Sequence, residues 1–295
     1  MNDAPKKKKV VSYSQFSKWY SCPNSFYLDY VKKLKMFEEN LIMSFGTAIH
    51  ETIQTYLKAL YKKTEEKADK MDMMKFFIWA FKKEITRKKI PHTPEQLAEF
   101  IEDGRKILEA FRQIDNRLKH FPTDKYELLD IEHELKIDIK NNVGVVAYLD
   151  LVLKERMTGK IKIIDIKTAT QGWNNYQKED FTKTSQLVLY KALYSKKYNI
   201  PLHMIDVEFF IVKRKLYENS TFPQSHIQIF KPKSHQADVL QVINEFSRFV
   251  DECFDLDGDY KQDMSHLKIP GKWSKNCKYC THKGKNCDAV PDLLP

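Results

Sequence analysis

A chain of 295 residues with 42% hydrophobic and 31% charged residues has the composition of an ordinary globular protein with a sizeable core. It contains no apolar run near the roughly 20 residues that span a bilayer, and its start, MNDAPKKKKVV, lacks the apolar core of a secretory signal. We therefore expect an intracellular protein with no membrane segment. Its 50 Lys and Arg against 40 Asp and Glu give a formal net charge of +10, which favours a polyanionic partner such as nucleic acid.

The first part of the chain is predicted to be a short basic arm followed by helices. Residues 1–11 form the arm, whose PKKKKV resembles a nuclear-import signal and equally fits a solvated segment that touches phosphate. Residues 12–125 form the helical region. One apolar helix face is predicted for Ile49, Ile53, Tyr56, Leu57 and Leu60. The segment PEQLAEFIEDGRKILEAFRQI continues the helical period after Pro94.

The middle of the chain changes from helical to strand character. Residues 127–168 alternate in LKIDIK, VGVVAYLDLVLKE and KIKIIDIKT, with a turn at MTG. A helix is expected in TSQLVLYKALYSKKY, then strands in IDVEFFIVKRK and HIQIF, and then a long helix. The apolar face of that last helix holds Val242, Phe246, Phe249 and Cys253. The fold class is therefore α/β, a mixed central sheet flanked by helices, with its core at 126–256 and a cysteine-bearing segment at 257–295.

Two charged residues interrupt the apolar strand IIDIKT. Burying charge is costly unless the charge is paired, hydrogen-bonded or bound to a metal. The MTG turn joins the strand of Asp150 to the strand of Asp165 in a hairpin. Whether Met157 and Thr158 or Thr158 and Gly159 form a two-residue loop, Asp150 lies on the same sheet face as Asp165 and Lys167. A three-residue loop or a bulge would move Asp150 to the other face.

Two carboxylates and one ammonium on a single face suit an oxygen-ligand Mg²⁺ or Mn²⁺ site with an adjacent lysine. Such an ion would neutralise the carboxylates, polarise a phosphodiester and lower the pKa of an attacking water. The lysine would orient that water or stabilise the developing negative charge. The alternative is a cross-strand ion pair at a sheet edge, with a structural role only.

The same residues resemble a known signature. Asp150, 14 further residues and then Asp165-Ile166-Lys167 resemble the D…(D/E)xK motif of the PD-(D/E)XK nuclease superfamily. Upstream, SYSQFSKWYSCPNSFYLDY and SFGTAIHETIQ resemble the entry to its RecB-type branch, with a Cys-Pro and a Gly-Thr-x-x-His. Downstream, QLVLY resembles the Q-x-x-x-Y motif of that branch. The resemblance implies a restriction-endonuclease-like core and a metal-dependent deoxyribonuclease.

The resemblance also implies a role for each residue of the motif. The metal ligands would be His50, Asp150, Asp165 and the main-chain carbonyl of Ile166. The catalytic lysine would be Lys167. Without the resemblance, His50 would be interpreted as a histidine that merely packs on a helix face.

Two residues of the following helix belong to the same resemblance. Gln186 and Tyr190 are one helical turn apart, so their side chains meet on one face. The resemblance places them beside the active site, where they position DNA for catalysis. Without it, Tyr190 would be interpreted as a half-buried residue of an amphipathic helix. Glu134, on the strand before Asp150, is a further candidate for a supporting acid.

Three of the five cysteines crowd into NCKYCTHKGKNC, with the C-x2-C-x6-C spacing of Cys277, Cys280 and Cys287. An odd number of cysteines in an intracellular chain favours metal or cluster ligation over disulfides. The resemblance adds Cys22 as fourth ligand and favours a 4Fe–4S cluster, although the spacing alone also fits Zn²⁺, for which His282 could replace one ligand. The cluster would be structural, fastening the C-terminal segment to the N-terminal region. Cys253 is expected to be a buried thiol.

The expected function is that of a DNA exonuclease acting on DNA ends or single strands in repair, recombination or replication. The alternatives are an iron–sulfur- or zinc-stapled nucleic-acid-binding subunit without its own catalysis, and a structural subunit of a recombination complex. The chain has no Walker-type G-x-x-x-x-G-K-S/T, so motor activity would come from a helicase or recombination partner. The expected compartment is cytoplasmic in a prokaryotic or phage-infected cell and nuclear or organellar in a eukaryote. The oligomeric state is not predicted.

Overall fold

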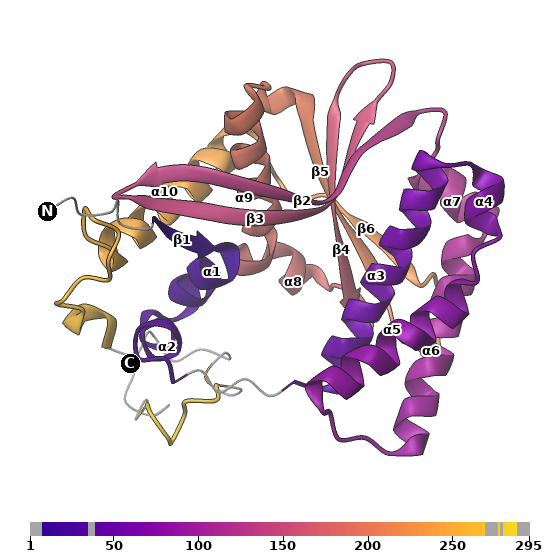
Figure 1. Ribbon diagram of the computed structural model, residues 1–295, viewed down its shortest axis with the longest axis horizontal. Coiled ribbons are helices and arrows are strands. Elements are labelled where there is room, and N and C mark those ends of the chain that lie inside the picture. Colours follow the sequence, from indigo (N-terminus) through magenta and orange to yellow (C-terminus); the bar gives the residue numbers. More distant parts are fainter. Residues whose placement is uncertain (1–7, 35–38, 269–276, 278–279, 288–295) are drawn as a thin grey trace, which may run out of the picture. The chain divides into compact units, whose positions relative to one another are not determined.

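The computed structural model describes residues 8–34, 39–268, 277 and 280–287 of the chain (Figure 1). The chain divides into two compact units. The terminal unit consists of Met1–Glu38, Glu134–Ala147 and Gln236–Pro295, and the central unit consists of Glu39–His133 and Tyr148–His235. None of the helices in the described residues is long and apolar enough to cross a bilayer.

The terminal unit joins short N-terminal helices to a long C-terminal helix through aromatic contacts. Its first elements are β1 (Lys9–Ser12), α1 (Tyr13–Ser21), α2 (Pro23–Phe26) and the π-helical turn η1 (Tyr27–Val31). Helix α10 (Gln236–Cys253) and the 3-10 turn η3 (Ser265–Lys268) also belong to it. The rings of Phe16 and Phe246 lie 5.2 Å apart. Cys253 is fully buried, which confirms the prediction made from its helix face.

The helices that open the central unit pack around a second aromatic core. They are α3 (Leu41–Lys62), α4 (Glu65–Asp69), α5 (Met73–Lys88), α6 (Pro94–Arg112) and α7 (Ile114–His120). Asn40 caps α3 by accepting the N–H of Met43. Thr93 and Gln96 form a capping box at the start of α6. The buried rings between these helices include Phe45, Phe77, Phe81, Phe100 and Phe111.

Strand β4 (Ile161–Ala169) lies inside the sheet of the central unit. Its neighbours are β3 (Val143–Glu155), which is antiparallel to it, and β5 (Ile205–Lys213), which is parallel. Strand β2 (Tyr126–Lys140) pairs with β3, and β6 (Ile227–Phe230) pairs with β5. The crossover from β4 to β5 contains α8 (Asn175–Glu179), α9 (Phe181–Tyr198) and the 3-10 turn η2 (Leu202–Met204). The fold is thus the predicted mixed sheet flanked by helices (Figure 1).

The hairpin between β3 and β4 has one of the two registers predicted. Leu151 lies opposite Ile164, and one further step along both strands places Asp150 opposite Asp165. The loop at residues 156–159 is longer than predicted, because Glu155 and Lys160 form its closing hydrogen bond at 2.8 Å. Its extra residues extend both sides of the turn equally, so the face on which each side chain lies is unchanged.

Candidate active site

Helix α3 approaches β4 closely because residue 46 is glycine. A Cβ atom at this position would lie 2.6 Å from Oγ1 of Thr168, closer than Cβ atoms approach other heavy atoms. His50 follows Gly46 by one helical turn, and Thr168 follows Lys167 directly. The close approach therefore brings the imidazole of His50 to the part of β4 that carries the motif lysine, which explains the glycine of the Gly-Thr-x-x-His motif.

His50 and Asp150 meet at the centre of the candidate site. Nε2 of His50 lies 2.8 Å from Oδ2 of Asp150, and the main-chain N–H of Ile166 donates to the same oxygen at 2.7 Å. Burial by itself would lower the pKa of His50, but Asp150, and more weakly Glu132 and Asp165, raise it above its usual value. The raised pKa reports a negative potential around the imidazole, which favours a bound cation.

Asp165 and Lys167 extend from one face of β4, as strand alternation predicted. Nζ of Lys167 lies 2.8 Å from Oδ2 of Asp165, a distance at which the ammonium donates a charge-assisted hydrogen bond to the carboxylate. Burial raises the pKa of Asp165 to about 6, although Lys167 opposes that rise. Burial would lower the pKa of Lys167, but Asp165 and then Asp150 outweigh it and raise that pKa. Lys167 is therefore held as an ammonium.

Glu132 and Gln54 join the site, and the sequence pattern had not indicated either. Oε1 of Glu132 lies 3.8 Å from Nδ1 of His50. Gln54, one helical turn after His50, donates its side-chain N–H to this carboxylate oxygen at 2.7 Å and to the main-chain carbonyl of Asp150 at 3.2 Å. In the sequence, Gln54 could have been noticed only by its position four residues after the motif histidine, which places it on the same helix face. The structure shows that this polar side chain is buried.

The structure places Glu132 in the supporting position proposed for Glu134. Glu134 instead pairs with Lys136, at 2.9 Å. The backbone of Glu132 is left-handed, with φ of 55°, which interrupts the regular alternation of β2. The buried residues Leu128 and Leu135 are accordingly separated by an odd number of positions. A pattern of apolar and polar residues carries no mark of such an interruption, so the prediction chose the wrong glutamate.

The donor set of the site fits a divalent cation. One ligand atom from each of His50, Glu132 and Asp150 lies within 4.8 Å of the other two. In the part of the chain that the structure describes, no other three His, Cys, Asp or Glu residues meet this criterion. Carboxylate oxygens suit Mg²⁺ and Mn²⁺, and Asp165 adds a further, buried carboxylate. The carbonyl of Ile166 stays a predicted ligand.

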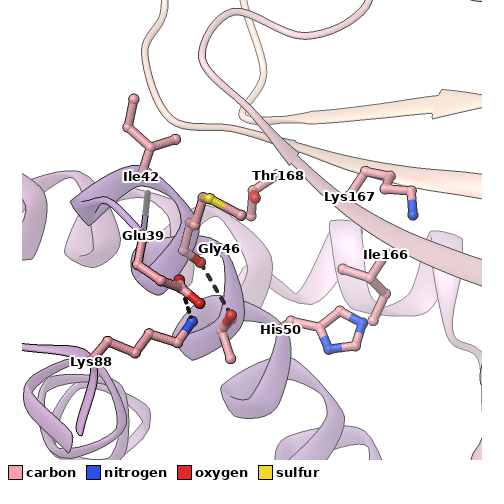
Figure 2. A pocket seen from close by; sticks show the side chains of 10 residues that line it. Glu39, Ile42, Gly46, His50, Lys88, Ile166, Lys167 and Thr168 are labelled. Carbon is pink, nitrogen blue, oxygen red and sulfur yellow. Dashed lines mark hydrogen bonds and ion pairs between the residues drawn. The ribbon is translucent and has the colours of Figure 1, made fainter. Parts of the chain in front are cut away.

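His50 and Ile166, together with Lys167, line a pocket of about 470 Å³ in the central unit. Figure 2 shows His50 on α3 and Ile166, Lys167 and Thr168 on β4 as parts of its wall. Ile42, which also lines the pocket, is exposed. The pocket is therefore open to solvent, as a site for a polymer must be.

Residues 10–284 of the chain match the sequence profile of the PD-(D/E)XK nuclease superfamily. The chain belongs to this superfamily. The fold is also similar to the crystal structure of a "Putative exonuclease" from Eubacterium rectale, with a TM-score of 0.50 and 11% identity, over 92% of this chain and 93% of that chain. At this identity the likeness concerns the fold alone. No curated protein matches the chain.

Membership of the superfamily gives the site a chemical context. Nucleases of this superfamily act on nucleic acid with the help of divalent metal ions, and the acidic group around His50 could hold such an ion. The D…(D/E)xK residues Asp150, Asp165 and Lys167 lie together on the antiparallel pair β3 and β4.

Gln186 and Tyr190, the two residues of the Q-x-x-x-Y motif, lie on α9. Nε2 of Gln186 donates to the hydroxyl of Tyr190 at 3.0 Å, as their helical spacing predicted. Tyr190 is buried, and Gln186 is half-buried. Neither residue lines the pocket around His50. Their predicted role in positioning DNA stays a prediction.

The four cysteines predicted as cluster ligands all lie in the terminal unit. Asn24, two residues after Cys22, donates its side-chain N–H to Sγ of Cys287 at 3.3 Å. The main-chain N–H of Cys280 donates to the carbonyl of Cys277 at 3.2 Å. Within the described residues, no three of the sulfur atoms lie within 4.8 Å of one another.

His282, considered as a substitute zinc ligand, is engaged by protein groups at both ring nitrogens. Nε2 lies 2.7 Å from Oδ1 of Asp29, and Nδ1 lies 3.3 Å from Nδ2 of Asn286. Burial would raise the pKa of Asp29, but Lys18 and His282 lower it. His282 therefore acts as the partner of a buried carboxylate, and the structure does not support its use as a metal ligand.

Proposed function

We propose that the chain is a Mg²⁺- or Mn²⁺-dependent deoxyribonuclease of the RecB-type branch, acting as an exonuclease at DNA ends or on single strands. The observation that supports this most strongly is the grouping of His50, Glu132 and Asp150, whose ligand atoms lie within 4.8 Å of one another. Asp165 lies opposite Asp150 on the neighbouring strand and contacts the ammonium of Lys167 at 2.8 Å. A purely structural cross-strand ion pair does not need a histidine and two further carboxylates beside it. A role in repair, recombination or replication with a helicase or recombination partner belongs to the same proposal.

His50, Asp150 and Asp165 would hold the cation, with Glu132 and the carbonyl of Ile166 as neighbouring donors. A bound divalent cation supplies a polarised phosphoryl oxygen and a water of lowered pKa. The ligand side chains are fixed in advance, because Asp150 already accepts the N–H of Ile166 and contacts His50. Such preorganisation removes the cost of rearranging the ligands when substrate binds.

Lys167 would act on the phosphate as a cation. Asp165 and Asp150 raise the pKa of its amine, which favours the ammonium over a neutral base. Its charge instead stabilises the negative charge that develops on the phosphoryl oxygens. Gln186 and Tyr190 would contact the DNA strand.

Closed circular DNA distinguishes an exonuclease from an endonuclease of the same fold. With Mn²⁺, we expect the protein to shorten end-labelled linear single strands and to leave a covalently closed single-stranded circle intact, because its substrate is a strand end. Gel analysis of both substrates in one reaction measures this. Cutting of the circle at a rate similar to that of the linear strand would contradict the exonuclease assignment and leave the nuclease assignment standing.

We further propose a 4Fe–4S cluster at Cys22, Cys277, Cys280 and Cys287. The contact between Asn24 and Cys287 supports a common site for the N-terminal and C-terminal cysteines. Tetrahedral zinc, with Zn–S bonds of about 2.3 Å, would need its sulfurs close together. The C-x2-C-x6-C spacing fits either zinc or a cluster, and the family resemblance is what favours the cluster. The cluster would fasten residue 22 to the C-terminal segment.

Cys280→Ala is expected to reduce the iron content and to lower the melting temperature by about 5 °C or more, because ligand binding contributes folding free energy. Cys253→Ala is the control, since this buried thiol is not a proposed ligand and should leave the iron content unchanged. Metal analysis and thermal unfolding of anaerobically purified protein measure both effects. An unchanged melting temperature and iron content in Cys280→Ala would refute the cluster, and stoichiometric zinc would replace it.

A further inference from the structure

A second pocket, of about 630 Å³, adjoins the candidate active site within the central unit. Both pockets are lined by Ile42 and Thr168, so they share a wall at the residue that follows Lys167 (Figure 2). The second pocket continues along the segment after β4, past Trp173, to Lys213 at the end of β5. A strand whose scissile phosphate lies at Lys167 would therefore have its next nucleotide at this pocket.

The segment that forms the second pocket is held in one conformation. The side-chain amide of Gln228 accepts the main-chain N–H of Trp173 at 2.7 Å and donates to its carbonyl at 3.0 Å. Gly172 has φ of 89°, and a Cβ there would lie 2.8 Å from Cδ of Lys213. The Trp173 ring packs on Phe209 at 4.8 Å. Glycine therefore lets the segment close over the stem of Lys213, and the pocket is preformed.

Two lysines line this pocket without an acidic partner among the described residues. Nζ of Lys183 lies 5.7 Å from the centre of the Trp173 ring. Neither Lys183 nor Lys213 forms an ion pair with any residue that the structure describes. No aspartate or glutamate is among the described residues that line the pocket. Burial, with no nearby carboxylate to oppose it, lowers the pKa of Lys213. An anion bound here would pair with both side chains and oppose the lowering of the pKa of Lys213.

We propose that this second pocket binds the backbone phosphate next to the scissile phosphate of the substrate strand, with Lys183 and Lys213 as its cationic ligands. The proposal rests on the proposed nuclease function and names a substrate-binding subsite for it. Phosphate contacts fix the register of a strand and carry no sequence information. Tyr217, a residue that is 60% exposed and lines the pocket, offers a ring on which the adjoining base can stack.

Binding of a fluorescent single-stranded oligonucleotide tests the subsite. In an Asp165→Ala background, which prevents cleavage, Lys183→Gln and Lys213→Gln together should raise Kd about tenfold at 0.1 M salt and lower the slope of log K against log salt by about 1. Lys197→Gln is the matched control, because Lys197 is exposed at the other end of α9. The oligonucleotide is then made with one neutral methylphosphonate linkage beside the scissile position. This linkage should weaken binding to the Asp165→Ala protein, which has both lysines. It should not weaken binding further when Lys183 and Lys213 are both replaced by glutamine.

The outcomes separate the subsite from the nuclease function. If the wild type cleaves DNA with Mn²⁺ while the double variant binds with the affinity and salt slope of Lys197→Gln, the subsite is refuted and the nuclease proposal stands. A full methylphosphonate effect in the double variant would also refute the subsite. If the wild type neither binds nor cleaves DNA, the nuclease proposal fails and the subsite fails with it.

Discussion

Replacing Lys167 with methionine is expected to reduce the rate of DNA cleavage by about 10²- to 10³-fold, the loss typical of removing one charge-stabilising donor from an active site. Methionine retains most of the length of the side chain and removes its charge. Asp165 then loses its adjacent cation and retains its proton more readily, since Lys167 is what opposes the rise in its pKa. Single-turnover cleavage with saturating Mn²⁺ and enzyme isolates the chemical step from substrate binding.

Lys167→Arg is the control for charge. It keeps the cation but replaces a compact ammonium by a planar guanidinium that does not fit the 2.8 Å contact with Asp165 in the same way. We expect it to recover part of the lost rate, while DNA affinity stays close to that of the wild type in both variants. A Lys167→Met protein that cleaves within threefold of the wild-type rate would rule out a catalytic role for the lysine.

Gly46→Ala is expected to reduce cleavage at least tenfold with at most a modest loss of thermal stability. The new Cβ would lie 2.6 Å from Oγ1 of Thr168, and we expect a shift of α3 away from β4, which carries His50 with it, to relieve this contact. A displacement of about 1 Å can cost about 100-fold in rate. Overpacking costs about 1–3 kcal/mol and alanine gains about 1 kcal/mol over glycine in a helix, so the free energy of unfolding should fall by no more than about 2 kcal/mol.

The double variant Gly46→Ala with Thr168→Ala makes this prediction specific. Alanine at 168 removes the oxygen that the new Cβ would meet, so α3 can return to its position and activity should recover. Thr168→Ala alone, with no such contact to relieve, should resemble the wild type. If the double variant is as inactive as Gly46→Ala, the glycine serves a purpose other than the close approach of α3 to β4.

Strand parity and motif spacing predicted the centre of the site because both depend on local geometry. Asp165 and Lys167 are two residues apart on a strand, which places them on one face whatever the rest of the fold does. The hairpin register places Asp150 opposite Asp165. The loop has four residues where two were predicted, but the extra residues are one on each side of the turn, so the register is the predicted one. His50 was placed by the resemblance, and the contact between Gly46 and Thr168 supplies the physical reason for it.

The rest of the site depends on features that a one-dimensional pattern does not record. Glu132 lies near His50 because its own backbone is left-handed in the middle of β2. Regular strand alternation had favoured Glu134 instead. Gln54 has its role through two hydrogen bonds to partners far away in the sequence. The second pocket brings together Lys183 of α9 and Lys213 of β5, which are far apart in the sequence.

Cleavage of labelled single-stranded DNA by the wild type and by Asp165→Ala, across Mg²⁺ and Mn²⁺ concentrations, tests the central claim most directly. The claim is that Asp165 is a ligand of a catalytic metal ion. The wild type should cleave in a metal-dependent manner that a chelator abolishes, and Asp165→Ala should show no cleavage at any concentration while retaining its fold by circular dichroism. Equal cleavage by the two proteins, or none by the wild type above the Asp165→Ala level, would contradict the account.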